Sequence, residues 1–224
     1  MATASPGRAE STRVGQLLLA RIADHGTATH LYAMGSDLAQ SSDASRNIAD
    51  LTHFLCVLHG RYPGVVDHAA GRVTDPGARA WLADAAYAFA GERAYLARLA
   101  VAAGPVPSTP GAADSDAAVR GQRHAIEMLA QSERSGCAIG AAMAVILDWT
   151  SVRRALDAAA HRFAIEPPTY AVGHPEAIAA VAESFATTPG TQRALIFGAE
   201  QILVQHYGLW DLLETRQQAR AAAI

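Results

Sequence analysis

Lysine is absent from this 224-residue sequence, so all 18 basic residues are arginine. A P-loop and Schiff-base chemistry are therefore excluded, because both need a lysine side chain. Cysteine is nearly absent: Cys56 and Cys137 each lie in an apolar helical stretch, and neither has a C-x-x-C partner. We interpret them as small buried hydrophobic residues in a reducing compartment, which excludes a disulfide framework and a cysteine zinc site.

Charge and aromatic residues are also scarce. Charged residues make up 17% of the chain and aromatic residues 6%, and the formal net charge is -3. This balance lacks the basic surface that displaces counterions from phosphates, so it argues against non-specific nucleic-acid binding. The hydrophobic content of 50% excludes a disordered chain, which could not bury enough apolar surface to fold.

Long hydrophobic runs are missing too. The strongest candidate, residues 137–147, has about 11 residues, whereas a bilayer span needs roughly 20. Near the N-terminus the apolar cluster 17–19 is soon interrupted by Arg21 and Asp24, so no signal-peptide core is present. We therefore expect no membrane segment, a cytoplasmic protein, and a flexible N-terminus over residues 1–10.

Alanine is the most frequent residue, 51 of 224, and it is the best helix former. No segment alternates apolar and polar residues as a half-buried strand does. The sequence therefore predicts an all-α fold with a single domain over residues 11–222. We expect a bundle of four or more long helices with shorter helices packed around it.

Proline, glycine and capping residues predict where the helices begin and end. Helices are expected over residues 11–24, 29–40, 43–59, 76–103, 114–133, 150–163, 176–185 and 191–220. Loops are expected over 60–77, with a short turn at 65–69, over 104–111 and over 167–175. An alternative boundary carries the fifth helix through Gly136 and Gly140 to Trp149. Those two glycines lie four residues apart, which would let another backbone approach closely.

Three long predicted helices each place one ionisable side chain on a face that should be buried. These residues are Glu92, Glu133 and His206, and Glu200 lies on the flank of the buried face of the last helix. A carboxylate buried without a partner costs several kcal/mol or more. Each of these side chains therefore needs an arginine, a histidine, a metal ion or water.

Glutamates and histidines that project inward from facing helices are the ligands of di-iron carboxylate proteins. This pattern favours a metal-dependent oxidoreductase with iron or manganese in a ferritin-like or haem-oxygenase-like bundle. The candidate ligands are Glu92, Glu133, Glu200 and His206, with His53 or His124 as additions. A standard di-iron centre needs Glu-x-x-His twice, and the chain contains no Glu-x-x-His. A single-metal site stays open.

The alternative interpretation is structural. Glu92 and Glu133 would then pair with arginines of neighbouring helices, and His206 would be a hydrogen-bonded core histidine. Candidate partners are Arg98, Arg123, Arg154 and Arg193. The protein would be a non-catalytic helical protein that binds an apolar small molecule or a partner protein between helices. Surface positions at helix ends or in loops are expected for His53, His59 and His68.

The last helix is apolar on a second face as well, which carries Ile196, Leu203, Tyr207 and Trp210. We expect this helix to be buried centrally or to contribute to a homodimer interface. The two functions differ in their geometry. An enzyme should bring the polar residues together around a cavity, whereas a binding protein should show an apolar pocket with its polar residues paired off elsewhere. The sequence leaves open whether the protein is an enzyme.

Overall fold

The computed structural model describes residues 13–170 and 173–222, and this part of the chain is helical with no β-strand. The predicted all-α class is confirmed, and the segment 1–10 lies outside the described residues. The elements are α1 (Val14–His25), the 3₁₀ helix η1 (Thr27–Thr29), α2 (Leu31–Met34), α3 (Asp37–Gln40), α4 (Ala44–His59), α5 (Val65–Arg72), α6 (Pro76–Ala103), α7 (Ala112–Ala130), α8 (Cys137–Arg162), α9 (Pro175–Phe185) and α10 (Pro189–Ala221).

Capping residues set the starts of the two longest helices. The Asp75 carboxylate accepts the backbone N–H of Ala78 at 2.8 Å, immediately before Pro76 at the first position of α6. Thr188 does the same for Thr191 at 3.2 Å at the start of α10. Both arrangements satisfy a backbone donor that a helix N-terminus leaves free. The predicted start of α6 at its proline signal is confirmed.

Several predicted boundaries are wrong. The helix expected over 29–40 is divided into α2 and α3, with a break at Gly35 and Ser36, and residues 27–29 form η1. The turn expected at 65–69 is the two-turn helix α5. The helix expected to start at Thr150 or Ser151 is the second half of α8, which runs without interruption because its buried face continues through Trp149 and Val152.

The break between α7 and α8 occurs at Gly136, which has φ 104°, a conformation that side chains other than glycine rarely adopt. The alternative boundary through Gly136 is therefore wrong. The close approach predicted for the glycines is confirmed. A Cβ atom at Gly140 would overlap the carbonyl of Leu195, and one at Gly198 would overlap the carbonyl of Cys137. Helices α8 and α10 thus pack backbone against backbone.

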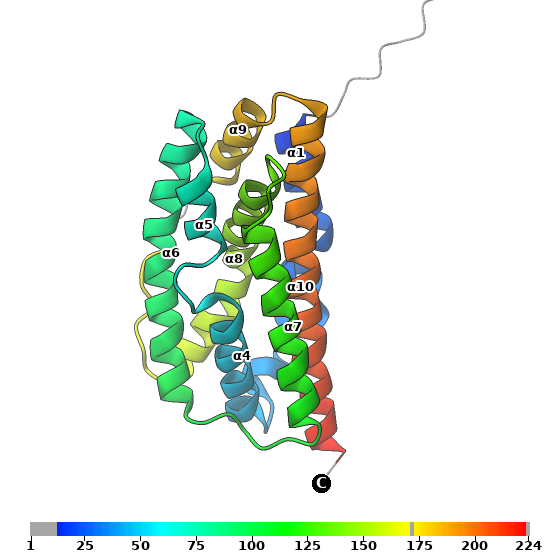
Figure 1. Ribbon diagram of the computed structural model, residues 1–224. Helices are drawn as coiled ribbons and strands as arrows, with labels where there is room; N and C mark the ends of the chain where they lie inside the picture. Colours follow the sequence, from blue (N-terminus) through cyan, green and yellow to red (C-terminus); the bar gives the residue numbers. More distant parts are fainter. Residues whose placement is uncertain (1–12, 171–172, 223–224) are drawn as a thin grey trace, which may run out of the picture.

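Helix α8 is the centre of the apolar core. Its buried residues include Met143, Ile146 and Trp149, each at most 2% exposed. Figure 1 shows α6 along one side of the molecule and α7 and α10 along the other, with α4 and α5 between them. Helix α9 packs against α1 near the start of α10. This arrangement places the inner face of α10 against α8 and leaves its outer face on the surface.

Both cysteines are free, as expected. Cys137 is buried and Cys56 is half-buried, and burial raises the pKa of the Cys56 thiol to about 11. A thiol in that state is a poor nucleophile at neutral pH. In the described part of the chain, no helix combines the length and apolar character needed to cross a membrane.

Candidate functional site

A row of buried polar side chains lies where α4, α8 and α10 meet. Nε2 of His59 lies 2.9 Å from Nε2 of His206, and Nδ1 of His206 lies 2.7 Å from Oδ2 of Asp148. The three residues are 4%, 1% and 1% exposed, respectively. The ring of His59 also makes edge contacts with Phe89 and Trp149. We call these three residues the histidine pair and its aspartate.

Asp148 is held by more than the histidine. Its Oδ1 accepts the backbone N–H of Thr27 at 2.7 Å, and its Oδ2 accepts the Thr27 hydroxyl at 2.6 Å. The same hydroxyl accepts the indole N–H of Trp210 at 3.0 Å. The carboxylate therefore has three donors inside the protein, and its burial is compensated by charge-assisted hydrogen bonds.

This geometry assigns the protons of the two rings. Because Asp148 is an acceptor, His206 carries its proton on Nδ1, and its Nε2 then accepts the Nε2–H of His59. Burial lowers the pKa of His59 well below its usual value, and the guanidinium charge of Arg93 lowers it further, as a second proton on His206 would. His59 is therefore a neutral donor to His206 at neutral pH.

Acid should destabilise the fold through His59. The pKa of its imidazole is lowered in the folded state, whereas in the unfolded chain it is near 6.5. Below about pH 6.5 the unfolded state therefore binds more protons, and the free energy of unfolding should fall by up to about 1.4 kcal/mol per pH unit from this group. Urea unfolding between about pH 5 and pH 8 measures this slope.

The matched variant is His59→Gln, which removes the titrating ring and keeps an N–H donor for His206. Its free energy of unfolding should depend less steeply on pH than that of the wild type. Equal slopes for the two proteins would contradict the assignment of a neutral His59.

Glu92 belongs to a second buried group, between α6 and α8. Its Oε2 accepts the indole N–H of Trp149 at 2.9 Å, and its Oε1 accepts from Nη1 of Arg153 at 2.7 Å. Arg153 also donates to Asp157 at 2.9 Å and to the carbonyl of Pro168 at 2.8 Å. Both carboxylate oxygens are satisfied by the protein. This geometry supports the structural interpretation of Glu92. Its arginine partner is Arg153, which is not among the arginines proposed from the sequence.

A third buried group joins α4 to the end of α10. Arg216 binds Asp50 through Nε at 2.9 Å and through Nη2 at 2.8 Å, and Arg220 donates to Asp50 at 2.6 Å. Arg220 also donates to the side chain of Asn47. The three charged side chains are 1–3% exposed. Two arginines therefore share one carboxylate in the core.

Glu133 and Glu200 lie away from these groups. The Glu133 side chain is 96% exposed and lies 3.5 Å from Arg72, so the prediction that it faces the core is wrong. The reason is that α7 ends at Ala130, so the helical register does not extend to Glu133. Glu200 is on the flank of the buried face as expected, 38% exposed and 2.7 Å from Arg21.

The additional ligand candidates are also separate. His53 is half-buried and its Nε2 lies 2.6 Å from the carbonyl of Gly104, whereas His124 is exposed on α7. Across residues 13–170 and 173–222, no group of three or more His, Cys, Asp or Glu side chains is arranged to hold a metal ion. The structure does not gather the four predicted ligands at one point, but it places His206 in the histidine pair.

The residues that complete these groups were not predicted from the sequence. His59 was expected at the surface and is buried, because it continues the core stripe of Leu51 and Leu55 at four-residue spacing. Asp148 directly follows the apolar segment 137–147, and apolar residues resume at Trp149. A single acid inside an apolar helix was the available signal for Asp148.

The outer face of α10 carries exposed apolar side chains above two hollows. Phe197, Val204 and Tyr207 are 41%, 58% and 40% exposed. A hollow of about 860 Å³ lies between α10, α1 and η1 and is lined by Leu203, Val204 and Tyr207 among others. A second, of about 390 Å³, is lined by Phe197 nearer the start of α10, and Glu200 lines both.

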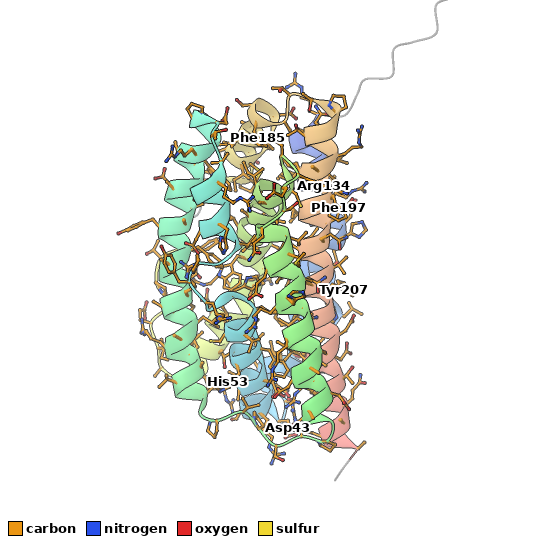
Figure 2. The ribbon with its side chains drawn as sticks, in the orientation of Figure 1. Asp43, His53, Arg134, Phe185, Phe197 and Tyr207 are labelled. Atoms are coloured by element: carbon orange, nitrogen blue, oxygen red, sulfur yellow. The ribbon has the colours of Figure 1, made fainter. Side chains whose placement is uncertain are left out.

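We use the name α10 face for the surface defined by Arg193, Phe197, Val204, Tyr207 and Asp211. Phe197 and Tyr207 lie on the outer side of α10 (Figure 2). Neither of the two hollows is lined by the histidine pair, its aspartate or Glu92. The exposed apolar surface and the buried polar groups are therefore separate features of the protein.

Comparisons with known proteins place this chain in a family. No curated protein and no solved structure matches the chain. A family model matches residues 22–221, a range that begins near the end of α1 and extends to the last residue of α10. The match includes every residue of the three buried polar groups and every residue of the α10 face. The chain therefore belongs to a family of unknown function (DUF6975).

Proposed function

We propose that this protein is a non-catalytic helical protein that binds a partner protein or an apolar small molecule at the α10 face. The observation that carries the proposal is the separation of its polar and apolar features. The buried His59, His206 and Asp148 are hydrogen-bonded in a row, Glu92 is bound by Trp149 and Arg153, and the hollows along α10 are lined by other residues. A binding protein should have this geometry, because its polar core groups specify packing and leave the ligand surface apolar.

The chemistry of the α10 face supports the same function. Large apolar side chains that are exposed together along one helix mark interaction sites more often than isolated ones do. Phe197, Val204 and Tyr207 share one face of α10, and the larger hollow, which Val204 and Tyr207 line together with residues of α1, offers a concave surface. The carboxylates of Asp24, Glu200 and Asp211 are also among the residues that line that hollow.

We also propose the finer architecture that the sequence predicts, a bundle whose long helices are α6, α7, α8 and α10. These helices contain 28, 19, 26 and 33 residues, and the shorter helices pack around them. A cytoplasmic location stays a prediction from the sequence.

A metal-dependent oxidoreductase that uses iron or manganese is the second candidate. The observation that favours it is the orientation of the histidine pair. The two Nε2 atoms face one another at 2.9 Å, and Asp148 holds Nδ1 of His206 from behind. Carboxylates orient metal-bound histidines in the same way. In this candidate His59 and His206 would supply imidazole ligands, and the ferritin-like or haem-oxygenase-like relationship stays a prediction.

One set of purified proteins tests both candidates. The uncharged apolar dye Nile red is titrated into the wild type, into Val204→Asp and into the control Tyr87→Asp, whose tyrosine is 86% exposed on α6. Dilute protein is used, so that association between copies does not cover the surface. We expect saturable binding that Val204→Asp weakens by about tenfold or more, equivalent to about 1.4 kcal/mol. The Tyr87→Asp variant should bind like the wild type.

Binding that both variants weaken equally, or that neither weakens, would contradict a site on the α10 face. Elemental analysis of the wild type and of His206→Ala for iron, manganese and zinc tests the second candidate. Near-stoichiometric metal that His206→Ala removes without unfolding the protein would favour the oxidoreductase and overturn the structural role of the histidine pair.

A further inference from the structure

We propose that the partner at the α10 face is a second copy of this chain, docked with the two α10 helices antiparallel across a twofold axis near Ile202. This inference deepens the proposed function and rests on it. It follows from the order of residues along the face, from their charges and from the hollow beside them.

The α10 face is straight. Arg193, Phe197, Val204, Tyr207 and Asp211 follow one another at spacings of three, four or seven residues, which keeps them on one side of an α-helix. All five are exposed. The face extends over about 27 Å, because each residue adds 1.5 Å along the axis. A second helix can therefore lie along it over several turns.

The order of these residues is self-complementary. In an antiparallel pair, residues equally distant from Ile202 in the sequence face each other. Arg193 then meets Asp211 of the partner subunit, and Phe197 meets Tyr207 of the partner subunit. Val204, near the axis, meets the partner's Glu200. A twofold interface requires such matching, because each contact occurs twice with the two subunits exchanged.

The charges at the two ends of the face are opposite. Within the described residues, neither Arg193 nor Arg134 has a carboxylate at ion-pair distance. Figure 2 shows Arg134 beside Phe197 at this end, and its guanidinium lies 5.8 Å from the phenylalanine ring centre. At the other end of the face, the Asp211 side chain is 61% exposed. Asp211 and Asp24 both line the larger hollow.

Only the antiparallel orientation brings these ends together favourably. Two parallel α10 helices would place Arg193 beside its own copy and Asp211 beside its own copy, and like charges in contact oppose binding. The antiparallel pair joins the positive end of each subunit to the negative end of the other.

The larger hollow gives the aromatic residue of the second copy a place. Tyr207 lines this hollow of about 860 Å³ together with Leu203 and Val204. In the antiparallel pair the partner's Phe197 lies opposite Tyr207 and enters it. Aromatic residues that fill a pocket on the partner are the usual centres of binding energy at protein interfaces. The arrangement therefore places an aromatic pair inside each ion pair, with Val204 and Glu200 between the two aromatic pairs at the axis.

Sedimentation velocity across a dilution series, up to about 100 µM protein, tests the inference, because a micromolar dimer would be nearly complete at that concentration. We expect the wild type to form a species of twice 23.4 kDa. Val204→Asp, near the axis, should raise the dissociation constant by about 30-fold or more, as for a central interface residue. The control Tyr87→Asp should dimerise like the wild type.

A charge exchange tests the orientation. Arg193→Asp and Asp211→Arg should each raise the dissociation constant by about tenfold or more, and the double variant should regain most of the lost affinity. Thermal unfolding of each variant checks that it is folded. A dimer that these variants leave unchanged, or a double variant weaker than both single variants, would overturn the antiparallel arrangement.

A wild type that stays monomeric throughout the series would overturn the dimer. If that monomer still binds the apolar dye in a way that depends on Val204, the proposed function stands and only the identity of the partner is wrong. If it neither dimerises nor binds the dye, both proposals fail.

Discussion

Replacing Gly140 with alanine is expected to lower the free energy of unfolding by about 3 kcal/mol, the upper end of the range for overpacked cores. The added Cβ would overlap the carbonyl oxygen of Leu195 in α10, and backbone atoms cannot rotate away as a flexible side chain can. Helices α8 and α10 would have to separate, and the contacts that they bury along their length would loosen. Urea unfolding followed by circular dichroism measures the change.

Gly91→Ala is the matched control. Gly91 lies inside α6, and a Cβ atom there meets nothing within 4 Å. Alanine is preferred over glycine in a helix interior by about 1 kcal/mol, so this substitution should stabilise the protein slightly. Opposite signs at the two glycines would show that the effect at Gly140 comes from helix packing. A Gly140→Ala variant as stable as the wild type would contradict the close contact between α8 and α10.

The same contact fixes the position of the buried polar row. His206 lies on the inner side of α10 and reaches Asp148 on α8 at 2.7 Å. A separation of the two backbones by even 1 Å would lengthen this hydrogen bond beyond its normal range. The glycines at positions 140 and 198 therefore keep the histidine pair in register as well as the apolar core.

Helix positions were predictable where local signals are strong. Pro76 with Asp75 before it gives the start of α6, and the pair Gly136 and Gly140 gives the close helix approach. Such features depend on a few neighbouring residues, so one sequence is enough to identify them. The prediction that Glu133 is buried was wrong because it depends on where α7 ends. The prediction continued the helical register to Glu133, whereas α7 ends at Ala130.

The partners of the buried charges were not predictable in the same way. Glu92 and Arg153 are 61 residues apart, and Asp50 and Arg216 are 166 apart. Pairings over such distances depend on the packing of whole helices, whereas helical periodicity reports only which face a residue occupies. The sequence could therefore indicate that Glu92 needs a partner without identifying it. For Asp50 the sequence gave no such indication, and its burial was not predicted.

Helix α10 combines two roles in this structure. Its inner side carries His206, Arg216 and Arg220, which bind carboxylates on α8 and α4. Its outer side carries the α10 face. Because the inner contacts hold the helix rigidly along its length, the outer side chains are presented at fixed spacing. A surface that must match a partner over several turns benefits from such support, since little ordering is needed on binding.

Replacing Asp50 with alanine is expected to lower the free energy of unfolding by about 3–5 kcal/mol, the cost of breaking a buried ion pair from one side. The substitution leaves Arg216 and Arg220 in the core, at 2% and 3% exposed side chain, without the carboxylate that both bind. The control is Asp84→Ala on the exposed side of α6, which should change the free energy by less than about 0.5 kcal/mol.

A triple variant separates the penalty of unpaired charge from the loss of packing. Asp50→Leu combined with Arg216→Met and Arg220→Met removes all three charges and fills much of the same volume with apolar groups. Buried ion clusters replaced in this way often lose little stability, so the triple variant should be more stable than Asp50→Ala. Urea unfolding of the four proteins gives the comparison. If Asp50→Ala matched the wild type, the two arginines would have to find other partners or reach solvent, and the buried group between α4 and α10 would not be what holds the end of α10 in place.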